Sequence, residues 1–151
     1  MRLNRRQIRM LNRYPRATRV WRLLCWNGGG MYSSGVGIGC IDFHGKVHPD
    51  QFWGHYELGD VRERRFGEIW TDTSDLLLGG LKERGKHIKG RCRVCRYFAG
   101  CGGSLRVRAD LHFGDPWAPE PACYLTDEEI GLDAAKRAEL VRAGEVFEMP
   151  E

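Results

Sequence analysis

Four cysteines are spaced as the ligands of one metal centre. Cys92, Cys95, Cys101 and Cys123 are separated by two, five and twenty-one residues. A C-x2-C turn lets two sulfur atoms face one centre while backbone N–H groups stabilise their negative charge. Four thiolates match either a tetrahedral Zn²⁺ or the four irons of a [4Fe-4S] cluster. The spacing therefore predicts a four-thiolate metal site.

The same spacing bears on which metal is bound. Zinc sites usually repeat a close pair of ligands on each side, whereas Cys101 and Cys123 are single cysteines 22 positions apart. A cluster is larger and accepts ligands from separate segments, so an iron–sulfur cluster is favoured. Zinc, and cysteines that bind no metal, remain alternatives. We expect Arg91, Arg93 and Arg96 to offset the charge of the thiolates.

The elements that must position these cysteines are short. The chain of 151 residues is long enough for one domain, but 20 glycines, six prolines and 42% apolar residues indicate a loop-rich body that a metal would stabilise. We expect an α+β fold: a small loop-rich domain with a β-hairpin, short helices and a four-cysteine metal site. Strands are expected at 36–43, 46–48 and 58–61, and helices at 5–13, 66–70, 74–84, 104–111 and 134–143.

Local signals set the ends of these elements. Gly45 supplies the positive φ of the hairpin turn. Ser74 is expected to cap a helix that presents Leu77, Leu78 and Leu81 as one apolar stripe. Thr126 and Glu129 fit a capping box, Gly131 ends that turn, and Asp133 is expected to cap the last helix.

Charge is distributed unevenly along the chain. The net charge is +4, yet residues 1–40 contain eight arginines and no acid. Such an arm suits nucleic acid, a lipid surface, a transit peptide or simply a solvated helix. The apolar segment from Trp21 to Trp26 is expected to pack against a docking partner. Met1 is followed by no apolar signal segment, and no run reaches the roughly 18 apolar residues of a membrane span, so we expect a cytoplasmic protein with reduced cysteines.

The cysteine run resembles a known domain. GRCRVCRYFAGCGGSLRVRA, with Cys123 behind it, is similar to the C-terminal auxiliary-cluster domain (SPASM, or the shorter twitch domain) of radical S-adenosylmethionine enzymes. The resemblance implies that the four cysteines ligate one auxiliary [4Fe-4S] cluster. SSGVGIGCIDFHGKVHPDQFWGHYELGDVRER and GDPWAPEPACYLTDEEIG narrow it to the proteins of haem d1 and alternative haem biosynthesis, over about 110 residues from Val20 to Gly131.

The sequence also departs from that family. A first auxiliary cluster in the family uses further cysteines, at positions where this chain has Asp50 and Leu105. One cluster is therefore implied, and Cys25 and Cys40 have no evident ligand role. Asp50 is either a metal ligand in place of a cysteine or, as is more common, a surface hairpin aspartate.

The resemblance implies an organisation and a role. Residues 1–27 form a basic N-terminal segment that corresponds at most to the last barrel element, 28–131 the SPASM-like or twitch-like iron–sulfur domain, and 132–151 a C-terminal helix and tail. The sequence has no C-x3-C-x2-C loop and no barrel. We therefore expect no reductive cleavage of S-adenosylmethionine by this polypeptide alone.

The implied role is electron transfer or substrate positioning in a tetrapyrrole-modifying enzyme. Its partners would be a tetrapyrrole substrate, an electron donor and a separate radical S-adenosylmethionine barrel protein. Arg106 and Arg108 would pair with tetrapyrrole carboxylates, and His48 or His55 would approach its iron or a carboxylate. The alternative is that the arginines lie on an exposed turn and the histidines pack beside aromatic residues as plain surface or core residues. The alternatives are a zinc-stapled interaction or nucleic-acid-binding module, and an inactive gene fragment.

Overall fold

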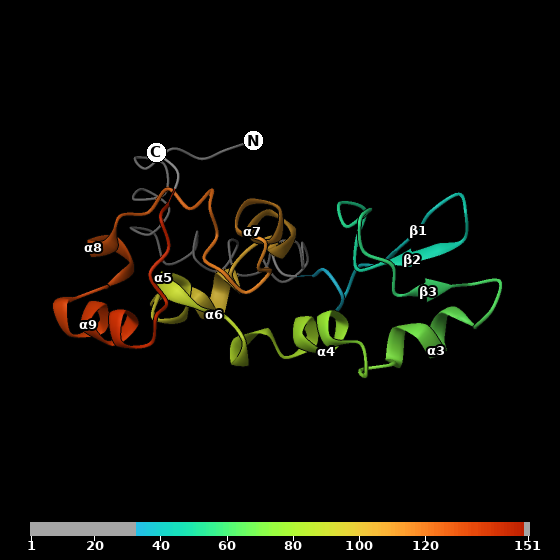
Figure 1. The fold of residues 1–151 in the computed structure, drawn as a ribbon, viewed down its shortest axis with the longest axis horizontal. Coiled ribbons are helices and arrows are strands. Elements are labelled where there is room, and N and C mark those ends of the chain that lie inside the picture. The colour runs from blue at the N-terminus through green and yellow to red at the C-terminus, as the bar shows by residue number, and fades with distance from the viewer. Residues whose placement is uncertain (1–32, 150–151) are drawn as a thin grey trace, which may run out of the picture. The chain divides into compact units, whose positions relative to one another are not determined.

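The computed structural model describes residues 33–149. The chain divides into two compact units, Met1–Met31 and Tyr32–Glu151, and the described residues belong to the second. Figure 1 follows this unit from three short strands through α3 and α4 to the later helices. The helix expected at 5–13, the segment from Trp21 to Trp26, and Cys25 lie outside the described residues.

The sheet is a small antiparallel meander. β1 (Cys40–Ile41), β2 (Lys46–His48) and β3 (Gly59–Asp60) lie in the order β1-β2-β3, and both pairings are antiparallel. Gly45 turns the β1–β2 hairpin with a φ of 83°, which glycine adopts without a steric penalty. The predicted hairpin and the third strand are confirmed.

The first predicted strand is too long. Residues 35–37 form a turn and Ile38 makes only an isolated bridge with Ser34, because the Ser33 carbonyl accepts hydrogen bonds from the N–H groups of Val36, Gly37 and Ile38 at 2.9 to 3.0 Å. A backbone that closes on one carbonyl is not free to pair along a strand. Regular pairing therefore begins at Cys40.

Two short helices and a 3₁₀ turn follow the sheet. They are α3 (Phe66–Thr71), α4 (Leu76–Lys82) and η1 (Arg84–Lys86). The predicted Ser74 cap is wrong: the Asp75 carboxylate accepts the Leu78 N–H at 2.7 Å, while the Ser74 hydroxyl donates to Asp72. α4 therefore starts one residue after Asp75.

Five further helices complete the described chain, each at most nine residues long. They are α5 (Gly90–Arg93), α6 (Phe98–Cys101), α7 (Arg106–Phe113), α8 (Asp127–Ile130) and α9 (Ala134–Arg142). The capping box of Thr126 with Glu129, the end of α8 at Gly131 and the Asp133 cap of α9 are confirmed. α7 starts later than predicted because Ser104 is left-handed, with a φ of 59°.

One apolar cluster joins the sheet end of the unit to the cysteine end. Trp53 follows the hairpin, Leu77 and Leu81 come from α4, and Val107 comes from α7; all four are buried together. Trp117 packs against this cluster. A Cβ added at Gly80 would lie 2.4 Å from the Trp117 ring, so α4 approaches the 115–121 segment at a distance that only glycine permits.

The described elements confirm the α+β class, with one three-stranded sheet and several short helices. None of the helices within residues 33–149 has the length and apolar character that crossing a bilayer demands.

A first prediction concerns stability and compares a buried with an exposed leucine of α4. Leu81→Ala is expected to lower the free energy of unfolding by about 2 to 5 kcal/mol, because Leu81 is 1% exposed and its loss leaves a cavity. Leu76→Ala on the same helix is the control, since Leu76 is 89% exposed and such changes stay within about 0.5 kcal/mol. Urea unfolding of both variants measures the difference, and equal effects would contradict this core.

A second prediction concerns pH and β3. Hydrogen bonds from Arg62 hold the pKa of the Asp60 carboxyl well below its usual value, and Lys46 lies 3.6 Å away. A depressed folded-state pKa gives stability that is present above the unfolded pKa of about 3.9 and lost as pH falls below it. Asp60→Asn should therefore be less stable than wild type at pH 7, with the gap narrowing by pH 3.

Thermal unfolding at both pH values measures that gap. Glu57→Gln is the matched control, because Glu57 also pairs with Lys46 but its side chain is 55% exposed, where ion pairs contribute little. A gap for Asp60→Asn that stays constant with pH would show that the carboxylate charge is not responsible.

Candidate metal centre

The four cysteines of the predicted site come from two segments. Cys92 lies in α5, Cys95 follows that helix, and Cys101 ends α6. Backbone hydrogen bonds from Cys95 N to Cys92 O (3.4 Å), from Phe98 N to Cys95 O (3.1 Å) and from Cys101 N to Tyr97 O (2.9 Å) wind this stretch into successive tight turns. Cys123 arrives separately, after the proline-containing segment 115–121.

Backbone N–H groups point at the sulfur atoms. Glu120 N donates to Cys92 Sγ at 3.3 Å, and Tyr97 N donates to Cys95 Sγ at 3.4 Å. At Cys101 the Ser104 N–H donates to the carbonyl at 2.9 Å, and the backbone of Gly103 and Ser104 acts to lower the pKa of the thiol. Such donors stabilise a thiolate, which is the form of cysteine that binds metals. The donor set suits sulfur atoms that become negatively charged.

A left-handed loop supplies the donors at Cys101. Gly102, Gly103 and Ser104 have φ values of 56°, 75° and 59°. In this loop the Gly102 N–H donates to the Phe98 carbonyl at 2.6 Å and the Ser104 N–H donates to the Cys101 carbonyl at 2.9 Å. The carbonyl oxygens are taken up by two arginines: Arg84 binds those of Gly102 and Ser104 at 3.3 Å, and Arg106 binds that of Gly103.

Charge on the cysteines of one segment affects the pKa values of the thiols in the other. Burial raises the pKa of the Cys92 thiol to about 11, and charge on Cys123 and Cys101 raises it further. The Glu120 N–H and the Arg106 guanidinium act in the opposite direction. Burial, with the charges of Cys123 and Cys95, likewise raises the pKa of Cys101. All four cysteines thus lie close enough for their charges to interact.

The cysteine side chains are not arranged around a single metal ion in the described residues. Within residues 33–149, no group of three or more histidine, cysteine, aspartate or glutamate side chains is arranged to hold one metal ion. The four-thiolate ligand set therefore stays a prediction.

The arginines next to the cysteines in sequence have other partners. Arg91 pairs with Asp127 at 3.3 Å and also donates to the Leu125 carbonyl. Arg93 pairs with Glu139 at 2.8 Å and Glu145 at 2.9 Å. Arg96 lies against Gly131, where an added Cβ would come within 2.5 Å of its guanidinium. These three arginines hold the segment that contains α8 and α9 against the cysteine loop.

The cation that acts on Cys92 is Arg106, which is fully buried. Its guanidinium donates to the carbonyl oxygens of Pro116 (3.1 Å), Ala118 (2.5 Å) and Gly103. It lies 3.8 Å from Glu120, which is also buried. The expected role of Arg106 in binding a substrate carboxylate is wrong for this structure, because no part of the side chain is exposed.

Arg108 is likewise held within the chain. Its guanidinium binds Glu120 Oε1 and Ser104 Oγ, both at 2.8 Å. Its side chain is 40% exposed, so Arg108 is engaged with a buried acid without being buried itself.

Three other residues singled out in the sequence lie in the sheet or beside it. His48 is buried between the Tyr56 carbonyl (2.8 Å) and Asp42 (3.5 Å), so both ring nitrogens are occupied. His55 binds Asp110 at 2.7 Å. Asp50 is 3% exposed and accepts from the Ser34 hydroxyl and from Phe52 N, so the surface alternative for it is wrong.

The remaining two positions belong to the scaffold. Cys40 lies in β1 and pairs with His48 across the sheet. Leu105, which replaces a cysteine of the resembled family, packs against the cluster of Trp53, Leu77 and Val107. An apolar residue at this position strengthens the core where the family would bind metal.

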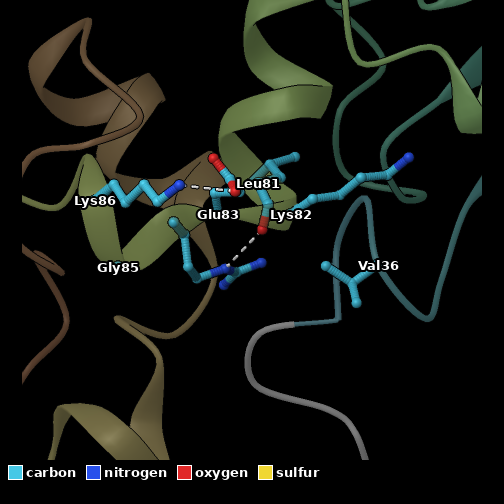
Figure 2. A pocket seen from close by; sticks show the side chains of 7 residues that line it. Val36, Leu81, Lys82, Glu83, Gly85 and Lys86 are labelled. Carbon is cyan, nitrogen blue, oxygen red and sulfur yellow. Dashed lines mark hydrogen bonds and ion pairs between the residues drawn. The ribbon is translucent and has the colours of Figure 1, made fainter.

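A pocket lies next to η1, and none of the residues that line it is a cysteine. Figure 2 shows this pocket of about 420 Å³. It is lined by Val36, Leu81, Lys82, Glu83, Arg84, Gly85 and Lys86. Lys86 pairs with Glu83 at 2.8 Å, Lys82 donates to the Trp70 carbonyl, and Arg84 donates to backbone carbonyls. Because these cations are engaged, we assign the pocket no ligand.

Sequence reasoning missed Arg84 and Glu120, and it gave Arg106 a different role. Charged residues are rarely buried unless paired, so no periodic pattern places an arginine or a glutamate inside a domain. One weak signal in the sequence points to Glu120: it is the one acid in the otherwise uncharged run PWAPEPAC. Its partners lie more than ten positions earlier in the chain.

Known proteins whose names refer to haem or coproporphyrin synthesis are similar to this chain. The Fe-coproporphyrin III synthase of Methanosarcina barkeri is 52% identical over 128 residues, 82% of this chain and 32% of that protein. The pre-heme d1 synthase of Dinoroseobacter shibae is 47% identical over 109 residues, 72% of this chain and 26% of that protein. The AdoMet-dependent heme synthase of Oleidesulfovibrio alaskensis is 35% identical over 91 residues.

The chain is thus a homologue of these proteins and spans about a third or less of their length. The predicted resemblance to radical S-adenosylmethionine proteins of haem synthesis is confirmed. No family model matches the chain, and no solved structure matches it with significance.

Proposed function

We propose that Cys92, Cys95, Cys101 and Cys123 bind one auxiliary [4Fe-4S] cluster. The observation that supports this most strongly is the convergence of two cysteine segments on one neighbourhood equipped with N–H donors and a buried cation. Four thiolates, one for each iron, complete such a cluster. The relatives named for AdoMet-dependent haem synthesis support iron over zinc.

We further propose that this domain serves a tetrapyrrole-modifying enzyme as its SPASM-like part. When bound, the cluster would supply one-electron transfer or a fixed contact for the substrate. The residues of this chain would hold it: the N–H donors at Cys92, Cys95 and Cys101 stabilise the thiolates, and burial of Cys92 excludes water. Cleavage of S-adenosylmethionine would take place on a C-x3-C-x2-C loop outside these 151 residues, in a partner barrel.

Anaerobic reconstitution tests the cofactor. The protein with iron and sulfide should turn brown and hold about four irons and four sulfides per chain. Metal analysis and absorption spectroscopy measure this. A colourless protein with one zinc per chain would contradict the proposal and favour the zinc-stapled alternative.

Cysteine variants test the ligand set. Cys123→Ala should abolish or sharply reduce cluster content, because it removes the only ligand outside the 92–101 segment. Cys40→Ala is the matched control, since Cys40 lies in β1, and it should load as fully as wild type. Iron per folded chain, checked by circular dichroism, is the measurement; equal iron in both variants would remove Cys123 from the site.

A further inference from the structure

We propose that Arg106 and Glu120 form a buried charge pair that positions the segment bearing Cys123 and sets the electrostatic field at the metal centre. This inference rests on the proposed function for the identity of the metal. Nothing in the spacing of the cysteines points to either residue. The pair would make Arg106 and Glu120 positioning residues, because neither is a metal ligand in the proposal.

Arg106 joins the two segments that hold the cysteines. One guanidinium nitrogen binds the carbonyl of Gly103, two residues after Cys101, and the other binds the carbonyls of Pro116 and Ala118, which lead to Cys123. A planar guanidinium with donors in fixed directions suits such a junction better than a lysine ammonium. Without these bonds, the buried carbonyls of both segments would lose partners.

Glu120 joins the same segment to Cys92 and Cys123. Its backbone N–H donates to Cys92 Sγ at 3.3 Å, and its carbonyl accepts Cys123 N at 3.1 Å. Its Oε1 accepts from Ala122 N at 3.0 Å and from Arg108 at 2.8 Å. One residue thus touches a proposed ligand on each side of the site.

Two atoms of the pair are unsatisfied. In the described part of the chain, Arg106 Nε and Glu120 Oε2 are buried without a hydrogen-bond partner. A buried charge without full hydrogen bonding is unfavourable unless another charge compensates it. A negatively charged centre at the neighbouring thiolates would compensate the guanidinium. The orphaned Arg106 Nε therefore fits a site that becomes negatively charged when metal binds, whereas the orphaned Glu120 Oε2 opposes that charge.

The two charges have opposite expected effects. The positive charge of Arg106 stabilises thiolates and the reduced, more negative form of a cluster, and Glu120 weakens that stabilisation. Glu120→Gln is nearly isosteric and should slow metal loss to a chelator about tenfold, whereas Arg106→Gln should speed it about tenfold. With iron bound, a tenfold change in the one-electron equilibrium is 59 mV, upward for Glu120→Gln and downward for Arg106→Gln.

Two further variants separate charge from packing. Arg106→Lys keeps the charge but loses the fork of carbonyl contacts, so the potential should stay near wild type while metal is lost faster. Arg64→Gln removes an equal charge from a side chain that is 48% exposed and pairs with Asp72, so it should shift neither quantity. All variants are compared as the full chain, with circular dichroism as the check on folding.

The outcomes separate the two proposals. A wild-type protein that holds zinc overturns the redox role, while opposite effects of Glu120→Gln and Arg106→Gln on zinc loss would still support the charge pair. Shifts of the same sign in folded variants, or no shift in Glu120→Gln, overturn the charge pair even where the cluster is present. A wild-type protein that binds neither metal overturns both.

Discussion

The cysteine region depends on the burial of guanidinium groups against backbone carbonyls. Residues 102–104 are left-handed, and their carbonyl oxygens face into the protein, away from the Cys101 thiol on which the Gly103 backbone acts. Buried carbonyls need donors. Arg84 from η1 and Arg106 from α7 supply them, and both side chains are buried. The loop that presents Cys101 is therefore fixed from behind by two arginines.

The same two arginines connect that loop to the rest of the unit. Arg84 also donates to the Ser34 carbonyl at 3.2 Å, and the Ser34 hydroxyl bonds Asp50 after β2. Arg106 also binds Pro116 and Ala118. Short helices and a three-stranded sheet bury little apolar surface on their own. Polar junctions, with the cluster of Trp53, Leu77, Leu81 and Val107, hold these small elements together.

Homology and geometry bear on different parts of the function. The relatives connect the chain to haem synthesis but extend well beyond it, so their activities belong to longer proteins. The structure adds that Arg106, Arg108 and His48 have partners inside the domain. Binding of a substrate by Arg106 or His48 would require these buried residues to give up internal bonds. Arg106 and Arg108 contribute to the cysteine region, whereas His48 belongs to the sheet.

The sequence by itself determined the local features: the Gly45 hairpin, the Leu77, Leu78 and Leu81 stripe, the Thr126 box and the spacing of the four cysteines. The first three depend on residues within a few positions of one another, and the cysteine spacing depends only on residue type and position in the sequence. The sequence-based prediction was wrong for the cap of α4, because the Asp75 carboxylate and not the Ser74 hydroxyl accepts the Leu78 N–H.

Only the tertiary structure decided which charges face the thiols. Arg91, Arg93 and Arg96 are adjacent to the cysteines in sequence, yet Arg91 and Arg93 pair with acids of the C-terminal segment, while Arg106 and Glu120 meet beside Cys92. The physical reason is that burial of a charge depends on partners brought from distant positions, and no local pattern records those partners.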